Sequence, residues 1–407
     1  MTEEIKARIE AVRRGEVPEG YSESIAGILP NDWTAKPLSE ISDVLSEQAG
    51  DGDYETLSIS AGIGFVNQAE KFGKELSGKQ YAKYTVLRRG DFAYNKGNSK
   101  RYPQGCTYML REREEAAVPN VFECFRIKEG YPEYYEQLFI NGFMNRQLTR
   151  KINHGVRDDG LLNLTDDDFY STILPIPPLA EQQKIAEILS TCDRVIELKQ
   201  QLLDEKRKQK QWLMQMLLDP DSGLRLPGFS QEWCTVKLGD ICTIKTGKLD
   251  ANAASEHGKY PFFTCSRDIY WIDTYSFDGD AILIAGNGDV GHTKLYSGKF
   301  DAYQRTYVLM NFGDLDYRLI KQYIDFTLLP VVYTELQGGA MPYIKLSTLT
   351  QLSFSVPVST KECESITKVL LSADNEIDVL EQELEAWQQK KKALMQLLLT
   401  GLVRVNA

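Results

Sequence analysis

Two segments of the chain, 180–218 and 362–399, contain neither glycine nor proline and are rich in glutamate, glutamine, lysine and leucine. These residue types favour helices, so each segment predicts one uninterrupted helix, roughly 57 Å long at ~1.5 Å per residue. Prolines at 175, 177 and 178 end the region before the first segment, and the next proline is Pro220. The rest of the chain must therefore fold around two long helices.

Apolar residues recur in both segments at heptad spacing. A narrow stripe of this kind, kept over many turns and present twice, favours a coiled coil over a helix that lies on its own domain. Lysines interrupt the stripe at 199, 206 and 210 in the first segment and at 391 in the second. The predicted seam comprises Ile185, Leu189, Ile196, Leu203, Leu213, Leu217, Ile366, Leu370, Ile377, Leu384, Leu394 and Leu398.

We expect the two helices to pair antiparallel. The region between them joins the end of the first helix to the start of the second, and antiparallel pairing brings these two points to the same end. Matching Ile185 with Leu398 also sets the seam lysines of 199–210 beside the acidic residues of 374–385. In a parallel pair the basic run would face the lysines of 390–392, and like charges across a coiled coil are unfavourable.

The sequence outside the helices contains an internal repeat. Segment 31–44, which contains a tryptophan, resembles segment 231–244, and in both halves a strand-rich region, a proline exit and a long helix follow. Residues 20–175 and 225–357 are rich in tyrosine, phenylalanine, threonine, isoleucine and valine, broken by glycine, asparagine and aspartate. This composition favours mixed α/β domains with many strands.

The expected fold class is therefore α+β, with two pseudo-repeated mixed α/β domains separated by two long antiparallel coiled-coil helices. The first domain is predicted at 1–178 and its helix at 179–219. The second domain is predicted at 220–358 and its helix at 359–407.

Composition limits the class of protein. The chain has 407 residues, a formal net charge of −11, seven cysteines and three histidines. The cysteines are dispersed without a C-x-x-C pair, which argues against a disulfide framework and a zinc site. No apolar run approaches the ~18 residues of a membrane span, and the charged N-terminus lacks the apolar core of a signal peptide. We expect a cytoplasmic protein without a membrane segment.

A G-x-G-x-x-G pattern at Gly286, Gly288 and Gly291 follows a run typical of a buried strand. A dinucleotide site needs a helix directly after these glycines, so that the helix N-terminus faces the pyrophosphate. Residues 302–310 favour another strand instead, and the counterpart in the first half, 93–105, keeps the position but lacks the glycine pattern. We therefore expect a turn or a recognition loop.

Catalytic motifs are missing from the sequence. It contains no Walker A sequence, no H-E-x-x-H, no G-x-S-x-G and no Asn-Pro-Pro-aromatic or Asp-Pro-Pro-aromatic tetrad of the kind that amino-methyltransferases use. The aspartates at 166–168 suggest a metal site, but the second half has 347–349, Ser-Thr-Leu, in their place. Acidic residues after asparagine or threonine are more typical of a helix start or a turn. We predict no catalytic residue and no metal ligand.

Positive charge is concentrated in the first domain. Residues 71–113 hold eleven lysines or arginines and three acids, with tyrosines interleaved, and 145–157 is basic without any acid. Such clusters can neutralise phosphates, and arginine, asparagine and glutamine can read base edges; the alternative is a solvated charged face. The DNA-binding candidates are Lys83, Arg88, Arg89, Lys96, Asn98, Lys100, Arg101, Arg146, Arg150, Lys151, Asn153, His154 and Arg157.

The second domain is less basic, so DNA binding and a solvated face are more evenly balanced there. Its polar and basic residues are spread over several predicted loops and strand ends. The candidates are Lys245, Lys248, Asn287, His292, Lys294, Gln304, Arg305 and Lys345.

Three segments resemble the specificity subunit of type I restriction–modification enzymes. Residues 174–189, "LPIPPLAEQQKIAEIL", are similar to that family's proline exit and to the start of its central spacer helix. Residues 226–241, "LPGFSQEWCTVKLGDI", and residues 20–41 are similar to its domain entries. The resemblance follows the whole chain in the same order, and the lysines in the first seam depart from the family pattern.

The resemblance implies that each domain is a target recognition domain for one half of a bipartite, asymmetric double-stranded DNA target, and that the helices set the gap. It implies two methyltransferase subunits as partners, which bring S-adenosylmethionine, and motor–endonuclease restriction subunits, which bring ATP and Mg²⁺. The chain itself would be non-catalytic and hold no cofactor. One alternative is an orphan DNA-binding or scaffold protein of the same fold that acts without a methyltransferase. The other is a fused or standalone enzyme, which the missing catalytic motifs disfavour.

Overall fold

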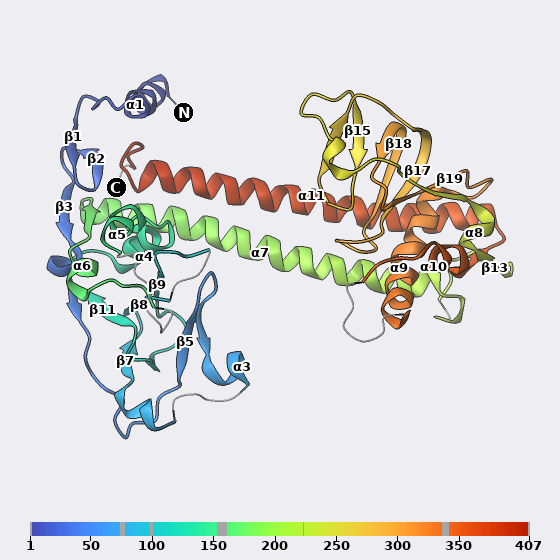
Figure 1. The fold of residues 1–407 in the computed structure, drawn as a ribbon. Helices are drawn as coiled ribbons and strands as arrows, with labels where there is room; N and C mark the ends of the chain where they lie inside the picture. Colours follow the sequence, from blue (N-terminus) through green and yellow to red (C-terminus); the bar gives the residue numbers. More distant parts are fainter. Residues whose placement is uncertain are drawn as a thin grey trace. The chain divides into compact units, whose positions relative to one another are not determined.

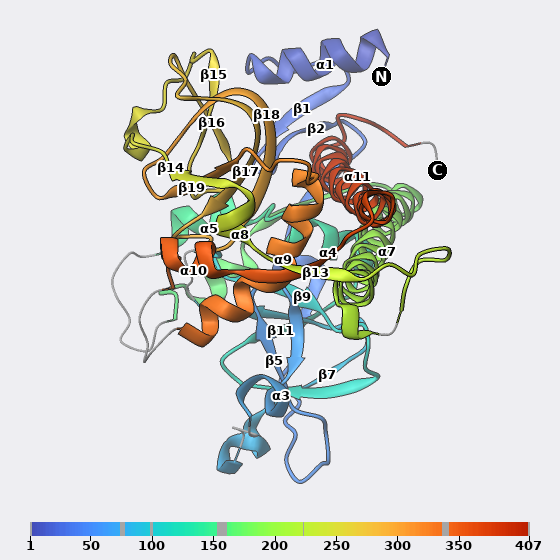
Figure 2. The ribbon, with the colours of Figure 1, turned by 90° about the vertical axis from the view of Figure 1, so that its right-hand side faces the viewer.

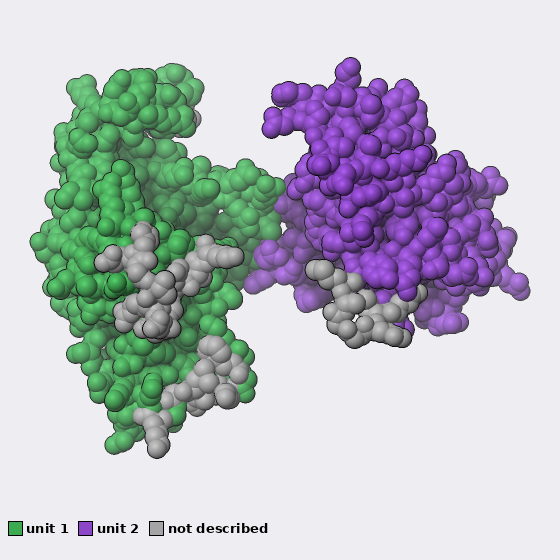
Figure 3. Space-filling model, in the orientation of Figure 1, with its two compact units in different colours: residues 1–198, 384–407 green, residues 199–383 purple. Residues whose placement is uncertain are grey.

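The computed structural model describes residues 2–73, 78–97, 101–152, 161–222, 224–335 and 342–405. The chain divides into two compact units, which Figure 3 shows in different colours: unit 1 is Met1–Leu198 with Leu384–Ala407, and unit 2 is Lys199–Glu383. This division passes through both long helices, whereas the boundaries proposed from the sequence follow the helix ends. Each unit therefore consists of one globular region and part of each helix.

The two long helices are α7, Leu179–Leu218, and α11, Thr360–Leu398 (Figures 1 and 2). They contain 40 and 39 residues, and their ends lie within two residues of the glycine- and proline-free segments 180–218 and 362–399. Helix α11 ends at Leu398, before the end of the helix region predicted at 359–407. Proline explains the bounds of α7, because a proline has no amide hydrogen for the helical hydrogen-bond ladder. Pro178 precedes the helix and Pro220 follows it.

The two helices are antiparallel, as predicted. In unit 2, the ammonium of Lys199 on α7 pairs with the carboxylate of Glu383 on α11 at 2.6 Å. Lys206 pairs with Glu376 at 2.8 Å. Residue numbers thus fall along α11 as they rise along α7, and these two seam lysines meet the acidic residues that antiparallel pairing assigns to them.

The predicted seam residues lie on the inner faces of the helices. Within the described chain none of them is exposed, and four, Ile196, Leu213, Ile377 and Leu394, are half-buried. The others are buried: Ile185, Leu189, Leu203, Leu217, Ile366, Leu370, Leu384 and Leu398.

Unit 1 has a four-stranded antiparallel sheet in the order β4-β11-β8-β9 and four two-stranded pairs, β1-β2, β3-β12, β5-β6 and β7-β10. Short helices surround these strands (Figure 1). In chain order its elements are α1 Glu3–Arg13, β1 Tyr21–Ser24, β2 Gly27–Pro30, β3 Thr34–Pro37, α2 Leu38–Ile41, β4 Ser42–Val44, β5 Leu57–Ser60, β6 Gly64–Asn67, α3 Gln68–Phe72, the 3-10 helix η1 Gly78–Lys83, β7 Thr85–Arg88, β8 Phe92–Asn95, β9 Cys106–Met109, β10 Glu115–Val118, β11 Glu123–Ile127, α4 Pro132–Ile140, α5 Asn145–Lys151, α6 Asp166–Tyr170 and β12 Ile173–Ile176.

Unit 2 has a six-stranded sheet in the order β14-β19-β17-β18-β15-β16 and the pair β13-β20. Its longest helix outside the long pair is α9, which contains Pro330. In chain order its elements are the 3-10 helix η2 Pro220–Ser222, β13 Trp233–Lys237, α8 Leu238–Ile241, β14 Thr243–Thr246, the 3-10 helix η3 Ala251–Ala253, β15 Tyr260–Phe263, β16 Ile269–Ile272, β17 Phe277–Ala285, β18 Thr293–Ala302, β19 Thr306–Met310, α9 Tyr317–Glu335, α10 Leu346–Gln351 and β20 Ser353–Pro357.

The repeat that is visible in the sequence reappears in the topology. The order β4-β11-β8-β9 in unit 1 matches β14-β19-β17-β18 in unit 2, strand for strand along the chain. The entry turns are also equivalent. The amide of Leu38 donates to the carbonyl of Thr172 at 2.9 Å, and the amide of Leu238 donates to the carbonyl of Leu352 at 2.8 Å. The predicted pair of pseudo-repeated mixed α/β regions is therefore confirmed.

The core of each unit includes residues of the long helices. In unit 1, the rings of Phe92 and Phe125 stack with centroids 5.3 Å apart, in the same buried cluster as Ile185 of α7. In unit 2, Tyr323 of α9 belongs to one buried cluster with Ile366 of α11. Burial of apolar surface is the main favourable term in folding, so each globular region is held to its part of the helix pair by its own core.

Both terminal regions of the chain meet in unit 1. The hydroxyl of Tyr21 donates to the carbonyl of Gly401 at 2.6 Å. The guanidinium of Arg8 donates to the carbonyl of Leu402 at 2.9 Å. The sequence analysis did not foresee this contact, because nothing in the two segments marks them as partners.

Three further observations concern the described residues. Within them, no group of three histidine, cysteine, aspartate or glutamate side chains could hold a metal ion. No helix of the described chain combines the length and the apolar character that crossing a bilayer requires. All seven cysteines are free.

Candidate nucleic-acid interface

Backbone hydrogen bonds gather four loops of unit 2 into one surface, which we call the unit 2 loop surface. The amide of Gly286 donates to the carbonyl of Arg305 at 3.0 Å, and the amide of Ile344 donates to the carbonyl of Gly286 at 2.9 Å. The amide of Gln304 donates to the carbonyl of Leu249 at 2.9 Å. The loop after β17, the turn before β19, the segment after β14 and the segment before α10 therefore lie together.

Most of the predicted DNA-binding residues of the second half lie on or beside the unit 2 loop surface. Asn287, in the loop after β17, is half-buried. Cations and amides at the same surface suit a ligand that presents phosphates and base edges together. The exposed members of the set are Lys245, Lys248, Gln304, Arg305 and Lys345.

Two predicted residues near the start of β18, His292 and Lys294, are half-buried. The ammonium of Lys294 donates to the carbonyl of Ser266 at 3.0 Å and to the carbonyl of Arg267 at 2.6 Å, so it braces the neighbouring loop. Burial lowers the pKa of Lys294. Burial also lowers the pKa of His292, which is half-buried, and the imidazole is therefore neutral at pH 7.

The glycines of the G-x-G-x-x-G pattern have local structural reasons. A Cβ on Gly286 would lie 2.5 Å from the carbonyl oxygen of Arg305, and Gly288 and Gly291 have φ angles of 66° and 79°. Such φ angles favour glycine. The strand predicted at 302–310 corresponds to β19, Thr306–Met310, and a further strand, β18, begins directly after the loop at Thr293 and runs through Gly298. The loop therefore has no helix N-terminus to receive a pyrophosphate.

The sequence analysis missed Arg267. Its side chain is 77% exposed and pairs with Asp289 of the loop after β17 at 2.7 Å. Arg267 comes from the segment between β15 and β16, which the topology brings to the unit 2 loop surface through Lys294. A lone arginine in a neutral segment carries no signal in the sequence.

In unit 1, five of the described basic residues of the run 71–113 pair with carboxylates from outside the run. Arg88 pairs with Glu47 at 2.6 Å, and Arg89 pairs with Glu114 at 2.6 Å. The hydrogen bond from Arg88 also lowers the pKa of Glu47. The net charge counted along the segment therefore overstates the positive charge at the surface.

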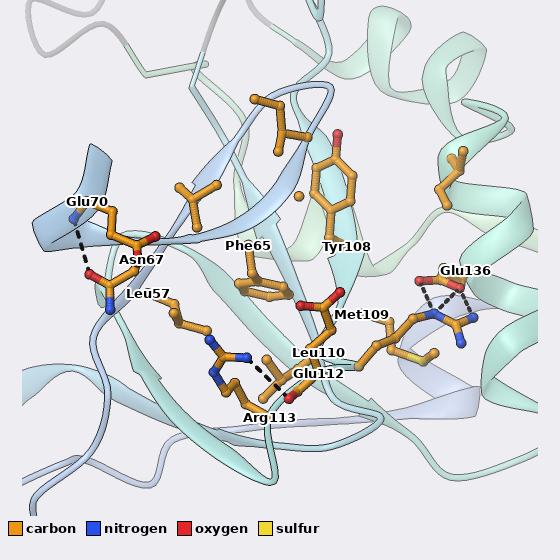
Figure 4. A pocket seen from close by; sticks show the side chains of 15 residues that line it. Leu57, Phe65, Asn67, Glu70, Tyr108, Met109, Leu110, Glu112, Arg113 and Glu136 are labelled. Carbon is orange, nitrogen blue, oxygen red and sulfur yellow. Dashed lines mark hydrogen bonds and ion pairs between the residues drawn. The ribbon is translucent and has the colours of Figure 1, made fainter. Parts of the chain in front are cut away.

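Two more arginines of the run lie at a pocket of about 440 Å³ between the β5–β6 hairpin, β9 and α4 (Figure 4). The guanidinium of Arg111 bonds the buried carboxylate of Glu136. Arg113 pairs with Glu55 at 2.6 Å. Because both guanidinium groups already have carboxylate partners, this pocket is a poor site for a phosphate.

Lys96 is also occupied within unit 1. Its ammonium lies 2.7 Å from a carboxylate oxygen of Glu123 and 2.6 Å from one of Asp166, and its side chain is only 12% exposed. Asp166 is the first residue of α6, and the side chain of Thr165 caps this helix by accepting from the amide of Asp168 at 3.1 Å. The aspartate run therefore starts a helix, as predicted.

Three exposed basic residues of unit 1 lie on α5 and near it. Arg146 and Arg150 are exposed on this helix, and no carboxylate of the described chain pairs with either. The side-chain amide nitrogen of Gln104 donates to the hydroxyl of Thr149 at 2.9 Å, which brings the segment after residue 100 to α5. Arg101, in that segment, is exposed and lies 5.7 Å from the ring centre of Tyr102. We call Arg101, Arg146 and Arg150 the α5 surface.

The remaining candidates of unit 1 divide into three groups. Lys83 is exposed at the end of η1. Lys151 donates to the carbonyl of Asp168 at 3.1 Å and to the hydroxyl of Ser171, which ties α5 to α6. Five candidates lie outside the described residues: Asn98, Lys100, Asn153, His154 and Arg157.

Comparison with known proteins gives a consistent result. The family model described as Type I restriction modification DNA specificity domain matches residues 120–205 and 230–387. The type I restriction enzyme EcoDI specificity subunit of Escherichia coli is 38% identical over 177 residues, which are 42% of this chain and 38% of that protein. The MjaVIII specificity subunit of Methanocaldococcus jannaschii is 25% identical over 288 residues, 61% of this chain and 66% of that protein. The chain thus matches less than two thirds of the length of these two relatives.

Two solved structures share the fold. The S subunit of a type I restriction–modification system from M. genitalium superposes with a TM-score of 0.64 at 16% identity, over 90% of this chain and 96% of that one. A chain from work on complex assembly and conformational transition of the type I R-M system gives a TM-score of 0.53 at 17% identity, over 92% and 99%. At such identities the likeness concerns the fold alone.

Proposed function

This chain belongs to the family of the type I restriction modification DNA specificity domain, and from that premise we propose that it is the DNA sequence-specificity subunit of a type I restriction–modification complex. Each unit reads one half of a bipartite, asymmetric double-stranded DNA target. The helix pair sets the gap between the two halves. A restriction system of this kind acts in the cytoplasm, against phage DNA.

One observation carries the proposal of a bipartite target. The same strand order, β4-β11-β8-β9 and β14-β19-β17-β18, occurs once in each unit. Yet the loops on the two frames differ in sequence and in exposed side chains. Two copies of one frame with different loops suit a ligand that has two related but unequal halves.

The α5 surface and the unit 2 loop surface are the proposed contacts with DNA. Arginine and lysine side chains at these surfaces bind phosphates and position the duplex. Gln304 and Arg305 are exposed side by side and carry the donors that read base edges in the major groove. Residues whose charged groups are held by internal carboxylates, such as Arg88 and Lys96, serve the structure instead.

We assign DNA methylation and DNA cleavage to partner subunits. Two methyltransferase subunits supply S-adenosylmethionine, and motor–endonuclease subunits supply ATP and Mg²⁺, while this chain carries no catalytic residue and no cofactor. Purified chain incubated with DNA, S-adenosylmethionine, ATP and Mg²⁺ should neither methylate nor cleave. Turnover that persists after rigorous removal of partner subunits would contradict the non-catalytic assignment.

The decisive experiment is to map methylated adenines across the genome with the chain present and with its gene deleted. A bipartite motif that disappears on deletion supports the specificity subunit. An unchanged methylation pattern, together with failure to co-purify with a methyltransferase, would instead support the alternative, an orphan DNA-binding or scaffold protein of the same fold.

A further inference from the structure

A three-residue polar bridge occurs once in each unit at equivalent places. In unit 1, the amide nitrogen of Gln137, on α4, lies 3.3 Å from a carboxylate oxygen of Asp193 on α7, and the same carboxylate accepts from Lys391 on α11. Each bridge therefore joins one domain helix to both long helices.

The unit 2 bridge repeats this chemistry with the long helices exchanged. The amide nitrogen of Gln322, on α9, lies 2.6 Å from a carboxylate oxygen of Asp374 on α11. The ammonium of Lys210 on α7 pairs with the same carboxylate. Lys210 and Lys391 are two of the lysines that interrupt the apolar seam, and the bridges give both of them a partner.

Both glutamines sit in the interior. Gln137 is 3% exposed and Gln322 is 0% exposed. Within the described residues, the side-chain oxygen of each amide is buried without a hydrogen-bond donor, so the bond to aspartate is the polar contact of the side chain. Leaving a buried amide oxygen unpaired is unfavourable. Neither glutamine is therefore explained by stability alone.

A role in positioning the domains would explain why both buried glutamines are present despite their unpaired amide oxygens. The domain helices also pack on the long helices through apolar side chains, such as Leu138 with Ile185 and Leu189 in one buried cluster. Such packing is non-directional and tolerates small adjustments. Charge-assisted hydrogen bonds have narrow geometric limits, and a polar residue in a coiled-coil seam is known to specify register.

A small shift of a domain along the long helices is enough to change the gap between two DNA half-sites. One base pair rises about 3.4 Å, and one helical residue rises about 1.5 Å. A displacement of about two residues along a long helix therefore corresponds to one base pair of gap. We propose that the bridges Gln137–Asp193–Lys391 and Gln322–Asp374–Lys210 fix where each recognition domain is attached along the helix pair, and that they thereby determine the gap length of the target. This rests on the proposed function.

The chain supplies its own control residues. Lys199 and Lys206 are also seam lysines, and they pair with Glu383 and Glu376 across the same helix pair. In the described part of the chain, no domain side chain hydrogen-bonds either glutamate. Loss of these two lysines should loosen the coiled coil to a similar degree without touching the attachment of a domain.

The test uses the chain in complex with its methyltransferase subunits and the bipartite motif mapped with the wild type. Duplexes carry both half-sites with the native gap or with the gap changed by one base pair, and single half-sites serve as a reference. In the double variant Gln137→Met and Gln322→Met, we expect the preference for the native gap to fall about a hundredfold, because two hydrogen bonds to charged groups are lost at about tenfold each. Binding to each single half-site should be unchanged.

The outcomes separate the possibilities. Retention of the native gap preference in the glutamine variant would overturn the proposal, and so would an equal loss of preference in Lys199→Met and Lys206→Met. If the glutamine variant fails to bind even single half-sites, the variant Lys210→Met and Lys391→Met decides by the same measurement. A wild-type chain without a bipartite motif would reject the proposed function itself, which is a different result.

Discussion

The carboxylate of Glu181 accepts two hydrogen bonds from the guanidinium of Arg404, both at 2.8 Å, although 223 residues separate the two along the chain. Glu181 lies in the first turn of α7 and also accepts from the indole nitrogen of Trp33 at 2.9 Å. Unit 2 contains the equivalent pair, with Arg225 bound to Glu362 in the first turn of α11 at 2.7 Å. These pairs anchor the starts of both long helices.

Arg404→Ala should destabilise the protein. The carboxylate of Glu181 is nearly buried, with 4% of its side chain exposed, and removal of its cation leaves an uncompensated charge. Because Arg404 is itself partly exposed, we expect a loss of about 2 kcal/mol in the free energy of unfolding, below the range for a fully buried pair. Chemical denaturation of the variant and the wild type measures this loss. The control Arg207→Ala removes the exposed pair with Glu381 and should cost under about 0.5 kcal/mol.

Arg150→Ala should weaken DNA binding and reduce its salt dependence. Each lost phosphate contact lowers the slope of log K against log salt by about one, and Arg150 is exposed on the α5 surface. Titration of labelled duplex at several salt concentrations gives the slope. Arg113→Ala is the matched control, because Arg113 is held by Glu55. Equal slopes in Arg150→Ala and wild type would show that α5 is only a solvated face.

The stability of the protein should fall in mild acid, in part through His292. Burial lowers the pKa of His292 in the folded state, so the unfolded chain binds its proton more readily. The contribution of His292 is therefore complete above the ordinary histidine pKa, about 6.5, and is lost as the pH falls through the folded value. Denaturation at pH 5 to 8 should show a smaller fall for His292→Gln than for wild type. His257→Gln, at an exposed position, should follow the wild type.

A disulfide should form between Ile185→Cys and Leu398→Cys under mild oxidation, in a Cys192→Ser background. Ile185 and Leu398 belong to the same buried cluster of unit 1, where the antiparallel helices meet. Ile185→Cys should not join Ile366→Cys, which belongs to the core of unit 2. Non-reducing electrophoresis distinguishes the two. Crosslinking to position 366 alone would be incompatible with antiparallel pairing.

Exchange of residues 20–175 for the equivalent domain of another family member should alter one half of the DNA target. The second half should stay as it is, because unit 2 keeps its own core, loop surface and bridge. The gap length should stay as it is when the incoming domain carries a glutamine at the place of Gln137, because that side chain completes the unit 1 bridge. Methylation mapping reads all three properties at once. A change in both halves of the motif would contradict modular recognition.

The parts of the fold that could be predicted are those encoded by local pattern. The ends of α7 and α11 follow from proline and from a long stretch of strong helix formers, and the antiparallel direction follows from the seam lysines and the acidic residues opposite them. The start of α6 follows from Thr165 and the aspartates behind it. In each case the residues that decide the structure are neighbours in sequence or recur at a fixed period.

The errors arose where distant residues meet. The count of charge along 71–113 could not include Glu47 or Glu136, which neutralise Arg88 and Arg111 from other elements. The sequence analysis made Lys294 a DNA-binding candidate, but its ammonium donates to backbone carbonyls of another loop. The contact of Glu181 with Arg404 could not be found either, because an ion pair between ordinary residues has no sequence signature. Surface charge is a property of the folded chain, and local counting overestimates it.

The neutralisation of the basic run has a consequence for how this protein would search a genome. Non-specific affinity for DNA comes mainly from counterion release, which grows with the number of phosphates that a protein neutralises. A chain of net charge −11 whose arginines 88, 89, 111 and 113 already bind its own carboxylates gains little from a random duplex. We expect short dwell times on bulk DNA and little sliding along it. Residence at a site would then be decided by base contacts and by the exposed cations of the α5 surface and the unit 2 loop surface.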